Sequence, residues 1–168
     1  MGIVRTALRG VAAGALATMA MDLVLYQRAR KDGSKQPFVD WEFSSGLDGF
    51  DDAPAPAKVG KKLADTVGVD LPDSSAGTVN NVVHWGTGIG WGKIGSFAAA
   101  ALPVPPAVVG VATGVGAWAS SYATLAPLGI YKPITEYPKD VLWKDLSVHL
   151  VYGGVLGLAY TALRGGRR

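Results

Sequence analysis

The chain has 168 residues, of which 49% are hydrophobic and only 17% charged, and its formal net charge is +3. This composition is too apolar for an ordinary soluble domain of this length, so a membrane is the expected environment. The chain contains no cysteine, which excludes disulfides, thiolate metal sites and cysteine nucleophiles. The mild positive charge is spread over loops and gives no sign of a nucleic-acid interface.

Hydropathy predicts an all-α, single-domain protein with four transmembrane helices, each close to the ~20 residues that cross a hydrocarbon core. The predicted spans are residues 6–26, 79–101, 106–130 and 146–164 of the 1–168 domain. Arg5 and Arg9 before the first span make it similar to a secretory signal. Its apolar sequence continues well past the small residues at 15–17 as far as Tyr26, so we expect an uncleaved span.

The hydrophilic segment 27–77 is expected to be an ordered extramembrane loop. The acids and prolines of residues 51–56 are typical of a helix start. Residues 57–67 then place Val59, Leu63 and Val67 on one helical face, which predicts a short amphipathic helix on the membrane surface. A packed extramembrane cap is the alternative interpretation.

Charge predicts the orientation of the four spans. The termini and the turn between the second and third spans fall on one side, which carries no acid and the arginines Arg5, Arg9, Arg164, Arg167 and Arg168. All 13 acidic residues lie on or toward the side of the longer loops. The positive-inside rule then predicts a multi-pass protein with both termini cytoplasmic. Arg28, Arg30 and Lys31, at the other end of the first span, count against this orientation.

One motif occurs twice, as His84-x-x-x-Gly88-x-x-x-Gly92 and as His149-x-x-x-Gly153-x-x-x-Gly157. A spacing of four places the three residues of each copy along one helix face. Because lipid gives no hydrophobic drive for helix association, such small residues predict close packing in a compact bundle. The predicted packing residues are Gly10, Gly14, Gly88, Gly92, Gly110, Gly114, Gly153 and Gly157. The two hairpins are also similar enough to suggest a parallel internal repeat.

The same helix faces lead to a polar layer near the loop side of the bundle. Asp22 continues the glycine face of the first span, and His84 lies at a similar depth in the second. An unpaired aspartate in hydrocarbon costs at least ~2.5 to 3.5 kcal/mol, so Asp22 should have a partner, be protonated or contact water. A hydrogen bond between Asp22 and His84, which would fix the imidazole tautomer, is the expected solution.

Further residues are expected in this layer, with Glu136 hanging over it from the proline-rich loop after the third span. The predicted ligand- or proton-binding residues are Asp22, His84, Trp118, Tyr122, Glu136 and His149. The alternative interpretation is that these polar side chains only hold the helices together. Haem held between His84 and His149 is a less favoured possibility, because the glycines that would make room for it serve helix packing equally well. No other cofactor or metal site and no catalytic residue is predicted.

Four stretches carry a resemblance to a known family. They are His84-Trp85 with the glycines that come next, Trp118-x-x-Ser121-Tyr122, Pro133-x-Thr135-Glu136-x-Pro138, and His149 with Gly153 and Gly157. Together they resemble the YagU-like small bacterial inner-membrane proteins, mainly over residues 78–163. The resemblance implies a polytopic bundle in the plasma (inner) membrane, of uncharacterised biochemistry, with a suggested link to acid tolerance. It supplies no catalytic residues.

The sequence favours a non-enzymatic function. The preferred hypothesis is an accessory or assembly subunit, or a homo-oligomer, that binds a membrane-protein partner through small-residue helix faces. The alternative is a pH-sensitive ligand or ion site at the loop-side membrane face, because histidine titrates near neutral pH. Asp22, His84, Glu136 and His149 would form that site.

Overall fold

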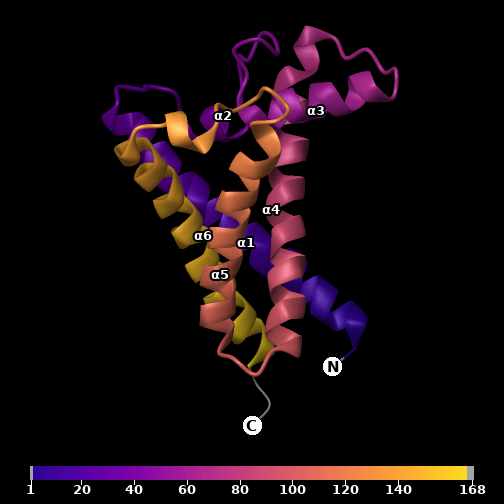
Figure 1. The fold of residues 1–168 in the computed structure, drawn as a ribbon, viewed down its shortest axis with the longest axis vertical. Coiled ribbons are helices and arrows are strands. Elements are labelled where there is room, and N and C mark those ends of the chain that lie inside the picture. The colour runs from indigo at the N-terminus through magenta and orange to yellow at the C-terminus, as the bar shows by residue number, and fades with distance from the viewer. Residues whose placement is uncertain (1, 166–168) are drawn as a thin grey trace.

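The computed structural model describes residues 2–165. The predicted all-helical class is confirmed, since no strand occurs within this range. Four long helices form the body of the molecule, and a cap of short helices covers one end of them (Figure 1). Arg167 and Arg168, two of the arginines on which the predicted orientation depends, lie outside the described residues.

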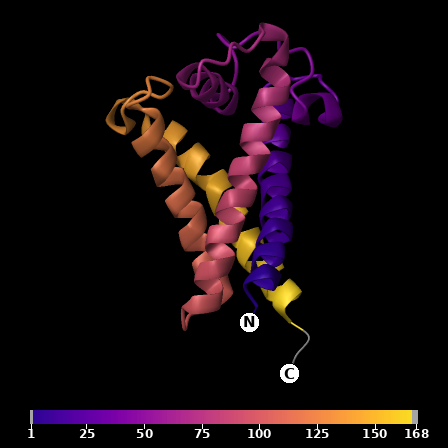
Figure 2. The ribbon, with the colours of Figure 1, turned by 90° about the vertical axis from the view of Figure 1, so that its right-hand side faces the viewer.

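The long helices are α1 (Ile3–Lys31), α4 (Ala76–Ala101), α5 (Pro106–Leu125) and α6 (Lys139–Arg164). The short elements are α2 (Phe38–Glu42), α3 (Ala55–Thr66) and the 3-10 turns η1 (Asp73–Ser75) and η2 (Ile134–Glu136). The start of α1, the turn between α4 and α5, and the end of α6 lie at the end of the molecule opposite the cap (Figures 1 and 2). This arrangement is the one that four antiparallel segments require.

Three helix ends differ most from the ends of the predicted spans: α1 and α6 extend into polar residues that hydropathy does not mark, and α5 stops short of residue 130. α1 continues to Lys31 through polar residues that favour helix. α5 ends at Leu125, shortly before Pro127, which has no backbone N–H with which to continue the helix. α6 begins at Lys139, directly after Pro138, and its first turn is polar.

The amphipathic helix predicted at 57–67 is present as α3, and its inner face packs on the start of α4. Ala57 is fully buried in a small cap core with Phe50, Ala53 and Ala76. Its outer face is apolar as well, because Leu63 is 62% exposed. The packed-cap interpretation is therefore confirmed for the inner face of α3, and the membrane-surface interpretation stays a prediction.

Two glycine seams hold the long helices in pairs, and all eight glycines predicted to pack helices lie in them. In the seam between α1 and α4, a Cβ on Gly14 would lie 3.0 Å from the Gly88 carbonyl oxygen and 3.0 Å from the Gly92 Cα. In the seam between α5 and α6, a Cβ on Gly153 would lie 2.5 Å from the Gly110 carbonyl oxygen. The backbones touch at these points, so no larger side chain fits without movement of a helix.

The two pairs join mainly where α1 packs on α6. Ala13 and Ala17 of α1 are fully buried there, in one core with Tyr152, Leu156 and Tyr160 of α6. By contrast, α4 and α5 meet at their connecting turn and diverge toward the cap (Figure 2).

Helices α1 and α6 are long and apolar enough to cross a membrane. Helices α4 and α5 do not reach the same mean hydropathy, because glycine, serine and, in α4, Lys93 lower it. Their outer faces are nonetheless apolar, with Val82, Ile94 and Phe97 exposed on α4.

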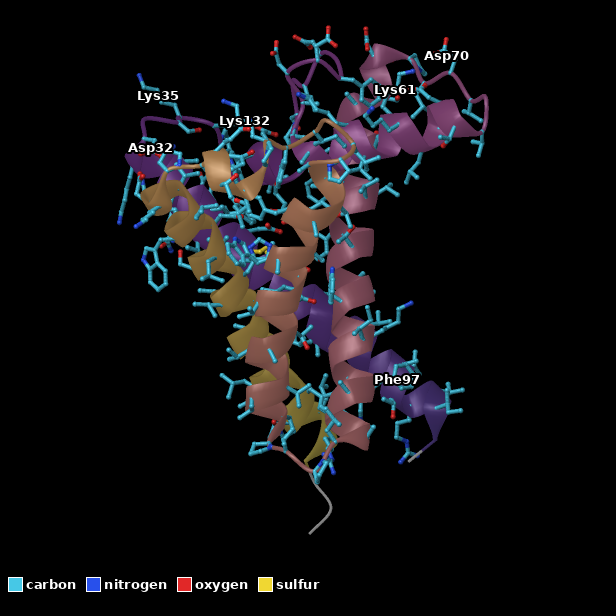
Figure 3. All side chains as sticks on the ribbon, viewed as in Figure 1. Asp32, Lys35, Lys61, Asp70, Phe97 and Lys132 are labelled. Atoms are coloured by element: carbon cyan, nitrogen blue, oxygen red, sulfur yellow. The ribbon has the colours of Figure 1, made fainter. Side chains whose placement is uncertain are left out.

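Figure 3 shows a polar end and an apolar body. The labelled charged residues Asp32, Lys35, Lys61, Asp70 and Lys132 all lie at the cap end, whereas Phe97 projects from α4 well away from the cap. Within α5 there is no charged residue at all, and within α4 only Lys93 besides His84. All acidic residues of the described chain other than Asp22 thus lie toward the cap end, whereas the opposite end carries the basic residues Arg5, Arg9 and Arg164.

Candidate functional site

A carboxylate–imidazole pair lies at the cap end of the first glycine seam. Asp22 comes about two turns of α1 after Gly14, and His84 precedes Gly88 by about one turn of α4. His84 Nε2 lies 2.9 Å from Oδ2 and 3.0 Å from Oδ1 of Asp22, which is only 2% exposed. Since a carboxylate can only accept, His84 donates its Nε2–H, and the neutral ring keeps Nδ1 as an acceptor. The hydrogen bond expected from the sequence is present.

Glu42, at the end of α2, adds a second carboxyl group to this pair. Trp85 Nε1 donates a hydrogen bond of 3.1 Å to Glu42 Oε1. The other oxygen, Oε2, is buried and has no hydrogen-bond partner among the described residues. Burial raises the pKa of Glu42 above its ordinary value, and the nearby charge of Asp22 raises it further. Glu42 therefore belongs to the same electrostatic unit as Asp22 and His84.

The first residues of α4 hold Glu42 in place. Asn80 Nδ2 donates to Ser44 Oγ at 2.9 Å, and Asn81 Nδ2 donates to the Phe43 carbonyl oxygen at 2.8 Å. Ser44 itself has a positive φ of 52°, so the chain turns sharply directly after α2. Glu42 was not among the predicted site residues, although two adjacent asparagines near the start of an apolar helix are a signal that a loop is bound there.

The second histidine is held within its own helix. His149 Nδ1 donates to the Asp145 carbonyl oxygen at 3.0 Å and lies 3.6 Å from Asp145 Oδ1. Tyr122 of α5 donates to the other carboxylate oxygen of Asp145 at 2.9 Å. Asp145 was not predicted either, because it lies one turn before His149 and outside the predicted span. Each helix pair, α1 with α4 and α5 with α6, thus has its histidine next to one carboxylate.

An aromatic cluster surrounds the second pair. The Tyr122 ring lies 5.6 Å from Trp118, 5.3 Å from Tyr131 and 5.4 Å from Tyr137, measured between ring centroids. Burial, with smaller contributions from Asp145 and Tyr137, raises the pKa of Tyr131 to about 12. Tyr131 is therefore a neutral phenol at physiological pH.

A cavity of about 630 Å³ lies between the two helix pairs and under the cap. It is lined by residues from α1, α2, α3, α4, α5 and α6, including Asp22, Glu42, Asn80, His84, Trp91, Ser121, Tyr131, His149 and Tyr152. Of the six residues predicted for a site, three line this cavity: Asp22, His84 and His149. Both histidines therefore face the same space.

The other three predicted residues do not line the cavity. Trp118 and Tyr122 pack behind its wall in the aromatic cluster, and the Tyr122 hydroxyl is bonded to Asp145. Glu136 is solvent-exposed, because the prolines on either side of η2 carry this turn over the surface of the cap. The expectation that Glu136 hangs over the polar layer was wrong, and Glu42 from the other loop takes that place.

The described residues can be compared with what a metal ion or a haem would need. No set of three or more His, Asp or Glu side chains within residues 2–165 is arranged to hold a metal ion. For haem, His84 would have to give up its bond to Asp22 or bind iron through Nδ1.

No family model, no curated protein and no solved structure matches this chain. The resemblance to YagU-like proteins therefore stays a prediction. The cavity and the apolar outer surface are the two features of the molecule that bear on its function.

Proposed function

We propose that this protein is a small, non-enzymatic integral membrane protein that binds a small amphipathic ligand in the cavity between its two helix pairs. The observation that carries the proposal is the cavity of about 630 Å³ lined by Asp22, Glu42, His84 and His149. Its size is typical of sites for small molecules, which are mostly apolar with a few polar groups. Met21, Leu25 and Val83 supply apolar lining beside those polar groups.

A membrane location is supported by the outer surface. Large apolar side chains are exposed along all four long helices, among them Leu16 on α1, Ile94 on α4, Val111 on α5 and Leu158 on α6. Exposed apolar area of this extent marks a surface that contacts lipid or protein. We therefore propose that α4 and α5 cross the membrane together with α1 and α6, as four spans.

The proposed orientation rests on the end of the molecule opposite the cap. That end carries Arg5, Arg9 and Arg164 and no acidic residue within the described chain. The positive-inside rule favours such an end in the cytoplasm. The cap and the mouth of the cavity then lie on the other side of the plasma (inner) membrane.

The proposed binding depends on pH. The ionisable groups that line the cavity or contact a lining histidine are Asp22 of α1, Glu42 of α2, His84 of α4, Tyr131 after α5, and Asp145, His149 and Tyr152 of α6. Protonation of an imidazole adds positive charge within the cavity, so ligand affinity is expected to depend on pH.

The cavity can be tested with 2-phenylethanol, a neutral amphipathic probe, and full-length protein in nanodiscs. Tryptophan emission reports binding, since Trp41 and Trp91 line the cavity. Ser121→Phe fills the cavity from α5 and removes only a hydroxyl bonded to its own helix, at the Trp118 carbonyl. Thr161→Phe is the matched control, because Thr161 also bonds back to its own helix but is exposed and outside the cavity.

Saturable quenching in the wild type and in Thr161→Phe, and its loss in Ser121→Phe, is the expected result. The same non-saturable response in all three proteins would mean that the probe only partitions into lipid, and the proposal would then be wrong.

The assembly function predicted from the sequence needs a different surface, because the eight packing glycines are used inside the fold. Gly86 and Gly90 of α4 offer one, since a Cβ at either position would meet no atom within 4 Å. Small residues spaced by four on a lipid-facing helix permit close helix association. Native mass spectrometry from mild detergent should then show a dimer that Gly86→Leu abolishes, and a monomer in every condition would contradict this second function.

A further inference from the structure

The cavity is lined by acidic side chains and by no lysine or arginine of the described residues. The acidic side chains are those of Asp22 and Glu42. One of the two carboxylates, Asp22, is matched by His84. The other, Glu42, receives only the neutral indole N–H of Trp85 on Oε1. Two carboxyl groups, Asp22 and Glu42, therefore share a single neighbouring imidazole, that of His84.

Two buried acceptors among the lining residues have no donor. Glu42 is 7% exposed and Asn80 is 8% exposed. Glu42 Oε2 and Asn80 Oδ1 both have no hydrogen-bond partner within the part of the chain that the structure describes. Buried acceptors left without a donor are unfavourable, so these two atoms point to a ligand that brings hydrogen-bond donors.

Hydroxyl groups on the remaining walls also present lone pairs to the cavity. Each hydroxyl contributed by α1, α5 and α6 donates its proton to a protein acceptor: Thr18 to Gly14 O, Ser120 to Ala117 O, Ser121 to Trp118 O, Thr124 to Ser120 O and Tyr152 to Gly88 O. The imidazoles of His84 and His149 likewise direct one N–H to protein acceptors. The donors left in the lining are neutral: the indoles of Trp41 and Trp91, the amide of Asn80 and the hydroxyls of Ser44, Thr87 and Tyr131.

We infer that the ligand of this cavity carries a protonated amine, which binds Glu42 and Asn80 while its apolar part lies against Trp41 and Trp91. The inference rests on the proposed function and names the chemical class of its ligand. An ammonium group brings up to three donors and one positive charge, which is what the two unpartnered acceptors and the two carboxyl groups that share one imidazole lack. Tryptophan rings near a cation add cation–π attraction.

Three probes that differ only in their polar head separate this inference from the proposed function. They are 2-phenylethylamine, 2-phenylethanol and 3-phenylpropionate, each titrated into full-length protein in nanodiscs and monitored by tryptophan emission at neutral pH. Ser121→Phe corrects for partition of each probe into lipid. The amine should bind roughly 10- to 100-fold more tightly than the alcohol, the range expected for a hydrogen bond to a charged group, and the carboxylate should bind more weakly than the alcohol.

Glu42→Gln keeps the shape of the side chain and removes its charge. The ratio of amine to alcohol affinity should then fall to near one, and Glu42→Asp should restore part of it. Asp48→Asn removes an exposed carboxylate elsewhere in the cap and should leave the ratio unchanged. Circular dichroism of each variant checks that helix content is retained.

Equal binding of amine and alcohol in the wild type, or tightest binding of the carboxylate, would overturn the amine inference and leave the cavity proposal in place. An unchanged ratio in Glu42→Gln would overturn the role given to Glu42. Saturable binding of none of the three probes would overturn both the inference and the proposed function.

Discussion

His84 Nε2 lies within 3.0 Å of both carboxylate oxygens of Asp22, so a hydrogen-bonded contact joins α1 to α4 directly above their glycine seam. The corresponding histidine of the second hairpin, His149, instead uses Nδ1 to bind the Asp145 carbonyl of its own helix. The two imidazoles therefore present different nitrogens to the cavity that they share.

The contact between Asp22 and His84 should be measurable as a coupling energy. In a double-mutant cycle of Asp22→Asn and His84→Gln, each single variant is expected to lose about 1 to 3 kcal/mol, because a buried partner is left unsatisfied. The double variant should lose less than the sum of the two by about 0.5 to 3 kcal/mol. Thermal unfolding in detergent supplies the measurement. Strictly additive losses would mean that the two side chains do not interact.

Adjacent glycines of α6 give a matched test of the second seam. Gly153→Ala places a Cβ 2.5 Å from the Gly110 carbonyl oxygen, so α5 and α6 must separate, and a loss of about 1 to 3 kcal/mol is expected. Gly154→Ala meets no atom within 4 Å and should be neutral or stabilising by up to about 1 kcal/mol. Equal melting temperatures for the two variants would contradict the seam.

The raised pKa of Glu42 predicts how stability depends on pH. The folded protein holds this proton at pH values where the unfolded chain, with its ordinary pKa of 4.5, has released it. The unfolding free energy contributed by Glu42 therefore falls as pH rises above about 4.5. Glu42→Gln removes this loss, so its melting temperature relative to wild type should rise from pH 4 to pH 7 by roughly a few degrees. A pH-independent difference, or one of opposite sign, would show that Glu42 is not destabilised by Asp22 and burial.

The orientation can be tested because the chain contains no natural cysteine. Ser45→Cys lies exposed in the cap, and Leu102→Cys lies exposed in the turn between α4 and α5. A maleimide that cannot cross membranes should label Ser45→Cys in intact cells and label Leu102→Cys only after permeabilisation. The reverse pattern would invert the proposed orientation, and labelling of both in intact cells would exclude a span between them.

Local sequence patterns were sufficient to predict the long helices and one contact of the site, the hydrogen bond between Asp22 and His84. Residues spaced by four share a helix face, so the glycine seams and the depth of Asp22 and His84 can be derived from the spacing alone. Helix ends were predicted less well, since polar turns at the ends of α1 and α6 carry no hydropathy signal. For α4 and α5, hydropathy alone also does not distinguish a membrane span from a glycine-rich helix packed inside a protein.

Contacts made through the cap could not be predicted in this way. Glu42 reaches the site because Asn80 and Asn81 hold the turn after α2, and no periodic pattern links that turn to α4. Glu136 was predicted instead because its stiff, proline-rich loop connects the third and fourth spans. Which of two loops covers a bundle depends on tertiary hydrogen bonds rather than on spacing.

A ligand cavity shared by the two hairpins requires that both histidines sense the same bound molecule. His84 and His149 are the only histidines in the chain, so NMR of protein made with isotope-labelled histidine reports on each ring directly. In the free protein the neutral rings should be the Nε2–H tautomer for His84 and the Nδ1–H tautomer for His149. Titration with 2-phenylethanol should shift both sets of ring resonances with one dissociation constant, and Ser121→Phe should abolish both shifts. A shift of only one histidine, or of neither, would contradict a common cavity.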